Sequence, residues 1–368
     1  MLPMTELTLS PGVTLRVVQT KKFKTSLLAV TFVEPLTAEH AALHALLPKV
    51  LHRGTQTHPD MQALSAALDE LYGGSIQPIL RKKGEVQCIG FWGSFLDEAF
   101  LPAGTSILEE ATALLGELVL APAGERGTFV PAYVDSEKKN LIDQIRAQLN
   151  DKLQYAMARL RGQMCAEEAY GLDKLGTEAQ ANAITGEALY TRYREMLAQA
   201  PVYLYYCGSA DPARVEAAFR AAFAGLPNRE RRPVPQTQVV NSPTGPVRRF
   251  QDAMDVGQGK LILGFRTGGS FRSQESIARG LLFNAIYGGT TTSKLFLHVR
   301  EKLSLCYFAN SSLAQNKGIL QVYSGVEFAN FQKAEEEILA QLAACQKGEI
   351  SQEEWEAARR SVMGSLRT

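Results

Sequence analysis

The sequence lacks a surplus of either charge, a long apolar run and any closely spaced pair of cysteines. Its 368 residues include 39 Lys and Arg against 38 Asp and Glu, which gives a net charge of +1. Nucleic-acid binding therefore has no support from composition. No run of about 18 apolar residues occurs, and the first residues lack a basic end followed by an apolar segment. We therefore expect neither a membrane span nor a signal peptide.

Cysteine usage points to a reducing compartment. The five cysteines are odd in number and widely scattered, and no Cys-x-x-Cys pair is present. This pattern is typical of free thiols rather than of a disulfide framework or a thiolate metal site. Together with the expected lack of a signal peptide, it predicts a cytoplasmic protein.

What is present is an internal repeat. Gly54-Thr55 recurs 235 positions later as Gly289-Thr290, and Lys83-Gly84 recurs 234 positions later as Lys317-Gly318. A near-constant offset between turn residues indicates duplication of one structural unit. Residue patterns predict two strands, two helices and a hairpin in each half, in that order: 13–18, 27–33, 38–52, 59–72 and 75–91, then 247–253, 260–266, 273–287, 293–303 and 307–326.

These patterns predict two domains joined by a proline-rich linker. Five prolines fall between Leu226 and Pro246, and such a segment is extended and semi-rigid. We therefore expect an N-terminal domain over residues 1–226, a linker over 227–246 and a C-terminal domain over 247–368. The second domain is much shorter than the first, and the sequence stops within a predicted helix, so we expect its C-terminal part to be missing.

The segment from Ala45 to Thr55 resembles the metal-binding helix of the pitrilysin/insulinase (inverzincin) peptidases. In that family a His-x-x-Glu-His helix leads into an Arg/Lys-Gly-Thr end. Counting back from Arg53-Gly54-Thr55, the His, Glu and His positions fall on Ala45, Pro48 and Lys49. The family's third zinc ligand lies seven residues after another glutamate, which here is Glu137, so that its position falls on Gln144.

These four residues are a poor set of zinc ligands. Catalytic zinc takes three protein ligands, usually imidazoles and a carboxylate, and leaves a position open for water. Alanine has no lone pair, proline cannot accept the proton of that water, and a lysine ammonium repels a divalent cation. A neutral amide is a weaker ligand than a carboxylate. The sequence therefore predicts no bound zinc and no catalytic residue in this chain.

His40 and His44 are alternative candidates for zinc ligands. Two imidazoles four residues apart share one helical face, which is a spacing that can hold zinc. However, Leu43 stands where the inverted motif needs its glutamate, and the pair lies five residues too early relative to Arg53-Gly54-Thr55. An independent zinc peptidase built on His40 and His44 is the least favoured alternative.

A second family signature is still present. His298-Val299-Arg300-Glu301-Lys302 leads to Tyr307, and it follows the glycine-rich Gly288-Gly289-Thr290 segment, as in the family's Arg-Glu-Lys-x-x-Leu-x-Tyr motif. The resemblance implies that Arg300 and Tyr307 bind substrate, because an arginine offers a fixed fork of donors and a tyrosine hydroxyl can donate to an oxyanion. A solvated helix face and an ordinary strand tyrosine are the plainer alternatives.

Similarity over essentially the whole chain identifies a catalytically degenerate bacterial branch of this family. The resemblance implies an α+β fold of two homologous domains, each a mainly antiparallel sheet covered by helices, of the insulinase/LuxS-metallohydrolase type. It also implies a non-catalytic subunit that pairs with a zinc-bearing insulinase-family paralogue and contributes to binding a peptide substrate. A homodimer and a non-enzymatic scaffold whose chamber holds peptides remain alternatives.

Overall fold

A computed structural model describes residues 4–125, 127–240 and 245–367. The chain divides into two compact units, each described by itself below. Unit 1 comprises Met1–Ala147 and Leu172–Gln236, and unit 2 comprises Gln148–Gly171 and Thr237–Thr368. Residues 148–171 thus pack within unit 2, whereas the predicted boundary at residue 226 places them in the first domain. Within this segment, residues 152–164 pack on residues 259–266, and Glu168 forms a buried ion pair of 2.7 Å with Lys317.

Unit 1 is built on a six-stranded sheet with the strand order β1-β2-β6-β3-β5-β4. Only β2 and β6 run parallel among these pairs; the other four pairings are antiparallel. Strand β6 lies between β2 and β3, and its residues are alternately buried and half-buried as a pleated strand requires. The strands are β1 (Met4–Ser10), β2 (Val13–Gln19), β3 (Thr25–Pro35), β4 (Ser75–Lys83), β5 (Val86–Leu96) and β6 (Val202–Gly208).

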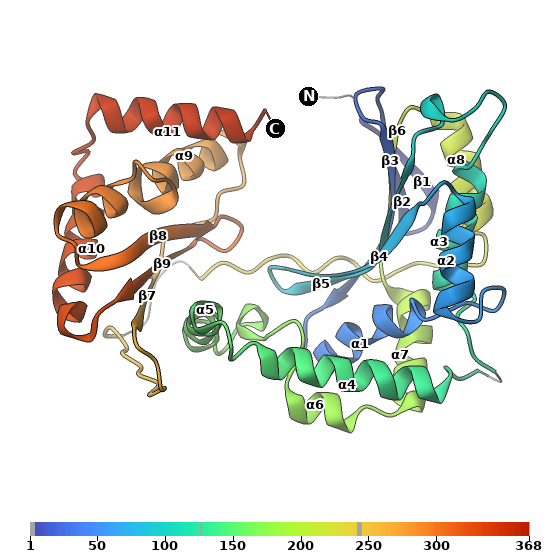
Figure 1. The fold of residues 1–368 in the computed structure, drawn as a ribbon, viewed down its shortest axis with the longest axis horizontal. Coiled ribbons are helices and arrows are strands. Elements are labelled where there is room, and N and C mark those ends of the chain that lie inside the picture. The colour runs from blue at the N-terminus through green and yellow to red at the C-terminus, as the bar shows by residue number, and fades with distance from the viewer. Residues whose placement is uncertain (1–3, 126, 241–244, 368) are drawn as a thin grey trace. The chain divides into compact units, whose positions relative to one another are not determined.

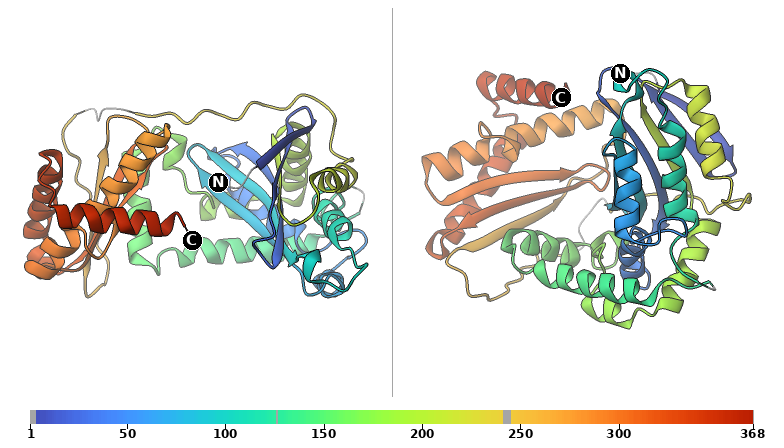
Figure 2. Two further views of the ribbon diagram at one scale, coloured as in Figure 1. Left: turned by 90° about the horizontal axis from the view of Figure 1, so that it is seen from above. Right: turned by 45° about the vertical axis from the view of Figure 1, so that its right-hand side comes forward.

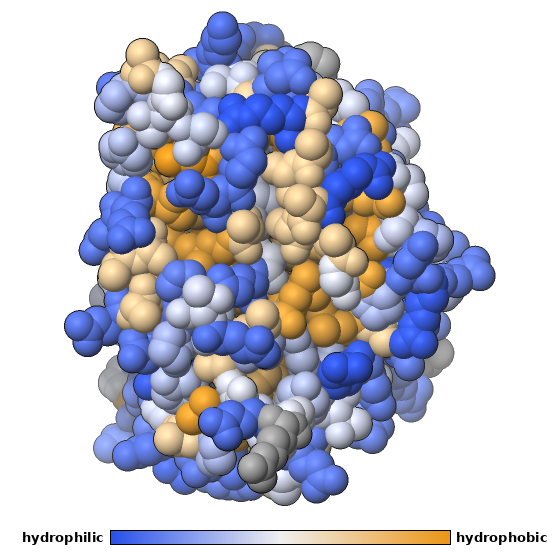
Figure 3. All heavy atoms as spheres, turned by 90° about the vertical axis from the view of Figure 1, so that its right-hand side faces the viewer, coloured by the Kyte–Doolittle hydropathy of each residue, from blue (hydrophilic) through white to orange (hydrophobic). Residues whose placement is uncertain are grey.

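Helices pack against this sheet and bury the main core of the unit. Helices α3 and α8 lie side by side (Figure 1), and α1 packs against β4 and β5. On the side of α2, α3 and α8, hydrophobic patches are interspersed among hydrophilic side chains (Figure 3). The helices are α1 (Ala41–Leu51), α2 (Met61–Glu70), α3 (Leu108–Leu120), α4 (Pro131–Ala147), α6 (Glu178–Ala183), α7 (Gly186–Gln199) and α8 (Pro212–Ala222).

Unit 2 is a three-stranded antiparallel sheet with the order β7-β9-β8. Helix α5 packs on β7, and α9 and α11 lie side by side (Figures 1 and 2). Two segments with π-helical backbone, η3 (Ala285–Gly289) and η4 (Leu295–Lys302), carry the glycine-rich stretch and the Arg-Glu-Lys motif. The other elements are α5 (Lys152–Met164), β7 (Gly259–Arg266), α9 (Gln274–Asn284), β8 (Cys306–Ala314), β9 (Ile319–Val326), α10 (Phe331–Gln346) and α11 (Gln352–Ser365).

The strand predicted at 247–253 is wrong. This segment has no strand geometry in the structure, and its side chains tie it to helices instead of to a ladder. Arg249 forms an ion pair of 2.7 Å with Glu335 on α10, and Asp252 accepts a hydrogen bond of 3.0 Å from Tyr155 on α5. The segment has only a weak strand tendency, and the ion pair and hydrogen bond to the helices outweigh it.

The predicted α+β fold with mainly antiparallel sheets is confirmed. The two hairpins of the repeat turn in the same way, because Gly84 and Gly318 both have left-handed backbone, with φ of 58° and 62°. Only glycine adopts this conformation without strain, which explains the recurring Lys-Gly pair. Within the part of the chain that the structure describes, none of the helices combines the length and apolar character that crossing a membrane requires.

Candidate functional site

The side chains of Lys49 and Gln144 meet at the contact between α1 and α4 in unit 1. Lys49 Nζ donates a hydrogen bond of 2.7 Å to Gln144 Oε1. Burial lowers the pKa of Lys49 from its ordinary value, and the carboxylate of Glu137 opposes that shift. The two residues predicted to stand at a histidine and a glutamate ligand position are therefore each other's hydrogen-bond partners.

Glu137 of α4 and Arg53, which follows the C-terminal end of α1, form a second link. Arg53 Nη1 lies 3.0 Å from Glu137 Oε1, and Asn140 donates to the other carboxylate oxygen at 3.2 Å. The Arg53 guanidinium also lies 5.0 Å from the centre of the Tyr133 ring. Both oxygens of Glu137 are thus occupied, and its carboxylate is held by a charge-assisted bond to Arg53.

The other two predicted zinc-site positions also offer no metal ligand. Ala45 is fully buried in the core, and Pro48 is buried inside α1, where it lacks a backbone N–H. Across the described residues, no group of three His, Cys, Asp or Glu side chains could hold a metal ion. The donor set at Ala45, Pro48, Lys49 and Gln144 does not fit the zinc that the family implies.

His44 is committed to a buried hydrogen-bond network. The Gln87 amide nitrogen donates to the carbonyls of Ala41 and Lys174, at 3.2 and 2.7 Å, which leaves its oxygen to accept from His44 Nδ1 at 2.7 Å. The other ring nitrogen of His44 accepts from Arg192 Nε at 2.9 Å. Both nitrogens of a neutral imidazole are therefore used, and neither offers a lone pair to a metal.

The surroundings of His44 also keep it uncharged. Burial, followed by the positive charge of Arg192, lowers its pKa to about 3. His40, one turn earlier, is half-buried, and the same two causes lower its pKa. His40 Nε2 lies 3.8 Å from the exposed carboxylate of Glu39. The i, i+4 histidine spacing thus reflects a buried structural histidine beside a partly exposed one.

Arg192 extends this network to a buried carboxylate. Glu34 is fully buried and contacts Arg192 at 2.6 Å and Arg232 at 2.7 Å. Burial raises the pKa of Glu34, while both guanidinium groups act in the opposite direction. Sequence reasoning did not single out these three residues, because they are far apart in the chain. The sequence feature that could have indicated this network is Glu34, a charged residue at the end of the apolar run of β3.

Arg300 and Tyr307 lie on neighbouring elements of unit 2. Arg300 is on η4, where its guanidinium lies 4.6 Å from the centre of the Phe296 ring and 3.4 Å from the Glu301 carboxylate. Tyr307 lies in β8 between Cys306 and Phe308, where the register with β9 shifts. Such a β-bulge re-aims the side chain at the irregular position and is frequent beside functional sites.

Both side chains are available to a ligand. The Arg300 side chain is 41% exposed and Tyr307 is 62% exposed. The Tyr307 hydroxyl is 3.5 Å from Glu327 Oε1, which is at the outer limit of a hydrogen bond. The π-helical backbone of η4 is itself a rare geometry that is often found at functional sites. The structure therefore gives Arg300 and Tyr307 no strong internal role.

The fold and the replaced ligand positions define a zinc-peptidase scaffold whose metal site has been lost. Residues 183–362 match the family model described as the peptidase M16 inactive domain. The probable inactive metalloprotease YmfF of Bacillus subtilis (strain 168) is 37% identical over 345 residues, covering 93% of this chain and 80% of that protein. The chain belongs to the M16 peptidase family, which confirms the resemblance found in the sequence.

Other relatives agree with this assignment. The uncharacterized zinc protease YmxG of Bacillus subtilis (strain 168) is 32% identical over 111 residues, which cover 30% of this chain and 27% of that protein. The crystal structure of a conserved protein from Enterococcus faecalis V583 matches with a TM-score of 0.88 and 28% identity, over 99% of this chain and 84% of that one. A peptidase M16 inactive domain from Pseudomonas fluorescens has the same fold, with a TM-score of 0.78, 17% identity and coverage of 100% and 85%.

Proposed function

We propose that this chain is the non-catalytic subunit of a two-subunit zinc peptidase of the cytoplasm. In this pair, a zinc-bearing family paralogue cleaves the peptide and this chain helps to bind it. One contrast carries the proposal. The positions that would hold zinc are closed by the bond between Lys49 and Gln144, whereas Arg300 and Tyr307 are exposed and weakly bonded.

The chemistry of the two exposed residues suits a peptide. The Arg300 guanidinium presents several donors in one plane, which matches a peptide carbonyl or a carboxylate. The Tyr307 hydroxyl can donate to the oxygen that becomes negative when water attacks a peptide carbonyl. Neither residue can activate water at neutral pH, so both require a partner that supplies the hydrolytic machinery.

The test is peptide cleavage by the purified pair. We expect Arg300→Ala to lower kcat/KM for an unstructured fluorogenic peptide about tenfold or more, since a charged hydrogen bond to the substrate is lost. The subunits should still co-elute on size-exclusion chromatography. Arg360→Ala is the matched control, because Arg360 is an exposed arginine of the same unit on α11. Unchanged kcat/KM with Arg300→Ala would overturn the assigned role.

A comparison with the paralogue alone separates this proposal from a scaffold function. If the pair cleaves the peptide faster than the paralogue does by itself, the chain contributes to catalysis by the complex. Equal rates, with peptide binding by this chain retained, would instead identify a peptide-binding scaffold. The same chromatography reports whether the chain forms a homodimer when the paralogue is absent.

A further inference from the structure

Unit 1 contains a cavity that is separate from the four predicted zinc-site positions. Its volume is about 600 Å³, which is within the range of small-molecule sites. Its walls come from the end of α3 and the loop after it, from α7 and from the segment that follows α8. None of Ala45, Pro48, Lys49 and Gln144 lines it.

The charged side chains that line this cavity carry a net positive charge. Arg194 and Arg229 line it, and neither has an acidic partner among the described residues. Glu195 also lines it, and its carboxylate forms an ion pair of 2.7 Å with Arg192. Exposed Glu125 and Glu230 lie beside the lining segments in sequence and are not part of the lining.

Arg229 is held in place by the end of α7. Its Nε atom donates to the carbonyl of Ala198 at 3.1 Å, and the neighbouring Arg231 donates to the carbonyls of Leu197 and Ala200 at 2.9 and 2.7 Å. Burial and the positive charge of Arg229 lower the pKa of Arg231. The backbone bond of Arg229 uses one of its five donors, so that its two terminal nitrogens remain for a ligand.

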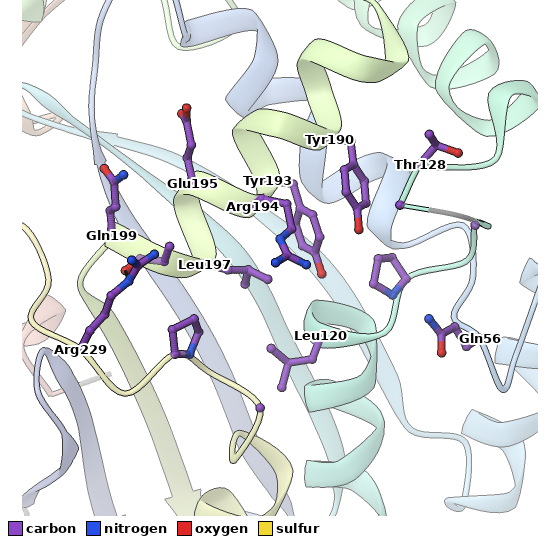
Figure 4. Close-up of a pocket in the computed structure, with 16 residues that line it drawn as sticks. Gln56, Leu120, Thr128, Tyr190, Tyr193, Arg194, Glu195, Leu197, Gln199 and Arg229 are labelled. Carbon is purple, nitrogen blue, oxygen red and sulfur yellow. Dashed lines mark hydrogen bonds between the residues drawn. The ribbon is translucent and has the colours of Figure 1, made fainter.

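The other walls combine apolar and aromatic side chains with the polar side chains of Gln56, Thr128 and Gln199. Tyr190 and Leu120 line the cavity together with Pro122 and Pro227. In Figure 4, Arg229 and Tyr190 lie on opposite sides of the lining, with Arg194 between them in this view. A ligand in this space would meet the guanidinium groups of Arg229 and Arg194 and, beyond Arg194 in this view, the phenol ring of Tyr190.

We propose that this cavity binds a small organic anion, whose carboxylate or phosphate contacts Arg194 and Arg229 and whose flat apolar body packs against Tyr190. Guanidinium groups bind the oxygens of carboxylates and phosphates in pairs, which gives both strength and orientation. Aromatic and proline walls favour a planar body over a flexible polar one. The proposal does not depend on the proposed subunit function.

Isothermal titration calorimetry with phenyl phosphate and benzoate tests the proposal. We expect saturable binding of at least one of these two anions, and the tighter of them identifies the oxyanion. Benzylamine, which has the same ring and the opposite charge, should not bind. Inorganic phosphate should bind about tenfold more weakly than phenyl phosphate if phosphate is the preferred group, because it lacks the apolar body.

Two substitutions assign the binding to the cavity. Arg194→Gln should weaken binding about tenfold or more, and Arg194 is exposed, so that the fold tolerates the change. Arg229→Gln should have a similar effect, with an unchanged thermal unfolding midpoint as the check on its α7 contact. Arg81→Gln, at an exposed arginine of β4 in the same unit, is the control. Absence of binding by both anions, or equal affinity in Arg194→Gln, would overturn the site.

Discussion

Lys49 Nζ donates to Gln144 Oε1 at 2.7 Å, which joins two helices whose facing residues are separated by 95 positions in the chain. In a metal site, these two positions would hold a divalent cation between them. Here the ammonium group itself supplies the positive charge, and Glu137 supplies a compensating carboxylate that is held by Arg53. The contact between α1 and α4 is therefore satisfied without any metal ligand.

We expect the chain purified alone to contain less than about 0.1 zinc per chain after dialysis without chelator. The reason is the donor set, since an ammonium and a neutral amide replace two anionic or imidazole ligands. Elemental analysis of the purified chain measures this directly. Zinc near one per chain would contradict the mapping of the motif and would make His40 and His44 the first residues to replace.

Restoring the family's residue types should restore zinc binding. The variant Ala45→His, Pro48→Glu, Lys49→His and Gln144→Glu places a complete ligand set and a base on α1 and α4, which already bring positions 49 and 144 together. We expect about one zinc per chain by elemental analysis. The matched control keeps Gln144 and carries the other three changes, and it should bind zinc at least tenfold more weakly. Equal zinc binding in both variants would show that position 144 is not a ligand site.

His44 should make the stability of unit 1 depend on pH below about 6.5. Its pKa is about 3 in the folded protein against an ordinary 6.5, so the unfolded chain binds an extra proton between these values. The contribution of His44 to stability is then complete above pH 6.5 and decreases by about 1.4 kcal/mol for each pH unit below it. The clearest window is pH 6.5 to 4.5. Glu98 and Glu109, whose pKa values are about 2, lose their stabilising contribution only below that window.

Urea unfolding of the wild type and of His44→Gln at pH 7, 6, 5 and 4.5 measures this dependence. The variant has no group that titrates at this position, so its stability should fall less steeply across the window. It should also be less stable at pH 7, because Arg192 loses its acceptor on the ring. Parallel slopes for the two proteins would show that His44 is not the titrating group.

Part of this structure could be predicted from the sequence, because local residue patterns determine individual helices, strands and turns. Helix α1 and the hairpin β4–β5 follow from apolar spacing and from a Lys-Gly turn that needs a left-handed residue. Strand β1 was not predicted; it lies at the edge of the sheet, where only Leu7 and Leu9 pack against the core. The pairing of Lys49 with Gln144 could not be read either, since no local pattern encodes a contact between helices 95 residues apart.

The placement of residues 148–171 in unit 2 was hidden for a similar reason. Helix α5 lies within this segment, and helical periodicity does not say which sheet a helix covers. The decisive contacts are a buried cluster in which Glu168 accepts from Lys317 at 2.7 Å and also pairs with Arg266. Lys317 is fully buried, and its ammonium lies 5.3 Å from the centre of the Tyr170 ring. Fully buried lysines are rare, so the sequence gave no reason to expect that this turn lysine would be buried.

This cluster should hold residues 148–171 on the rest of unit 2. Lys317→Met removes the ammonium and leaves Glu168 with one cationic partner, Arg266, so we expect a loss of about 3 kcal/mol in the stability of unit 2. Limited proteolysis should then cut within 148–171 faster than in the wild type. Lys333→Met, at an exposed lysine of α10, is the control and should change neither quantity. Resistance to proteolysis and unchanged stability would show that the cluster does not anchor the segment.

Tyr307 and Arg300 should affect different kinetic constants of the proposed pair. Tyr307→Phe keeps the exposed ring and removes the hydroxyl, so that the fold and the binding of the peptide are little changed. If the hydroxyl donates to the oxyanion that forms during hydrolysis, kcat falls about tenfold to a hundredfold while KM stays the same. Arg300→Ala should mainly raise KM, because a guanidinium that binds the intact peptide stabilises substrate and transition state alike. Steady-state kinetics on one fluorogenic peptide distinguish the two patterns. A rise in KM without a fall in kcat for Tyr307→Phe would assign Tyr307 to peptide binding instead of to stabilisation of the oxyanion.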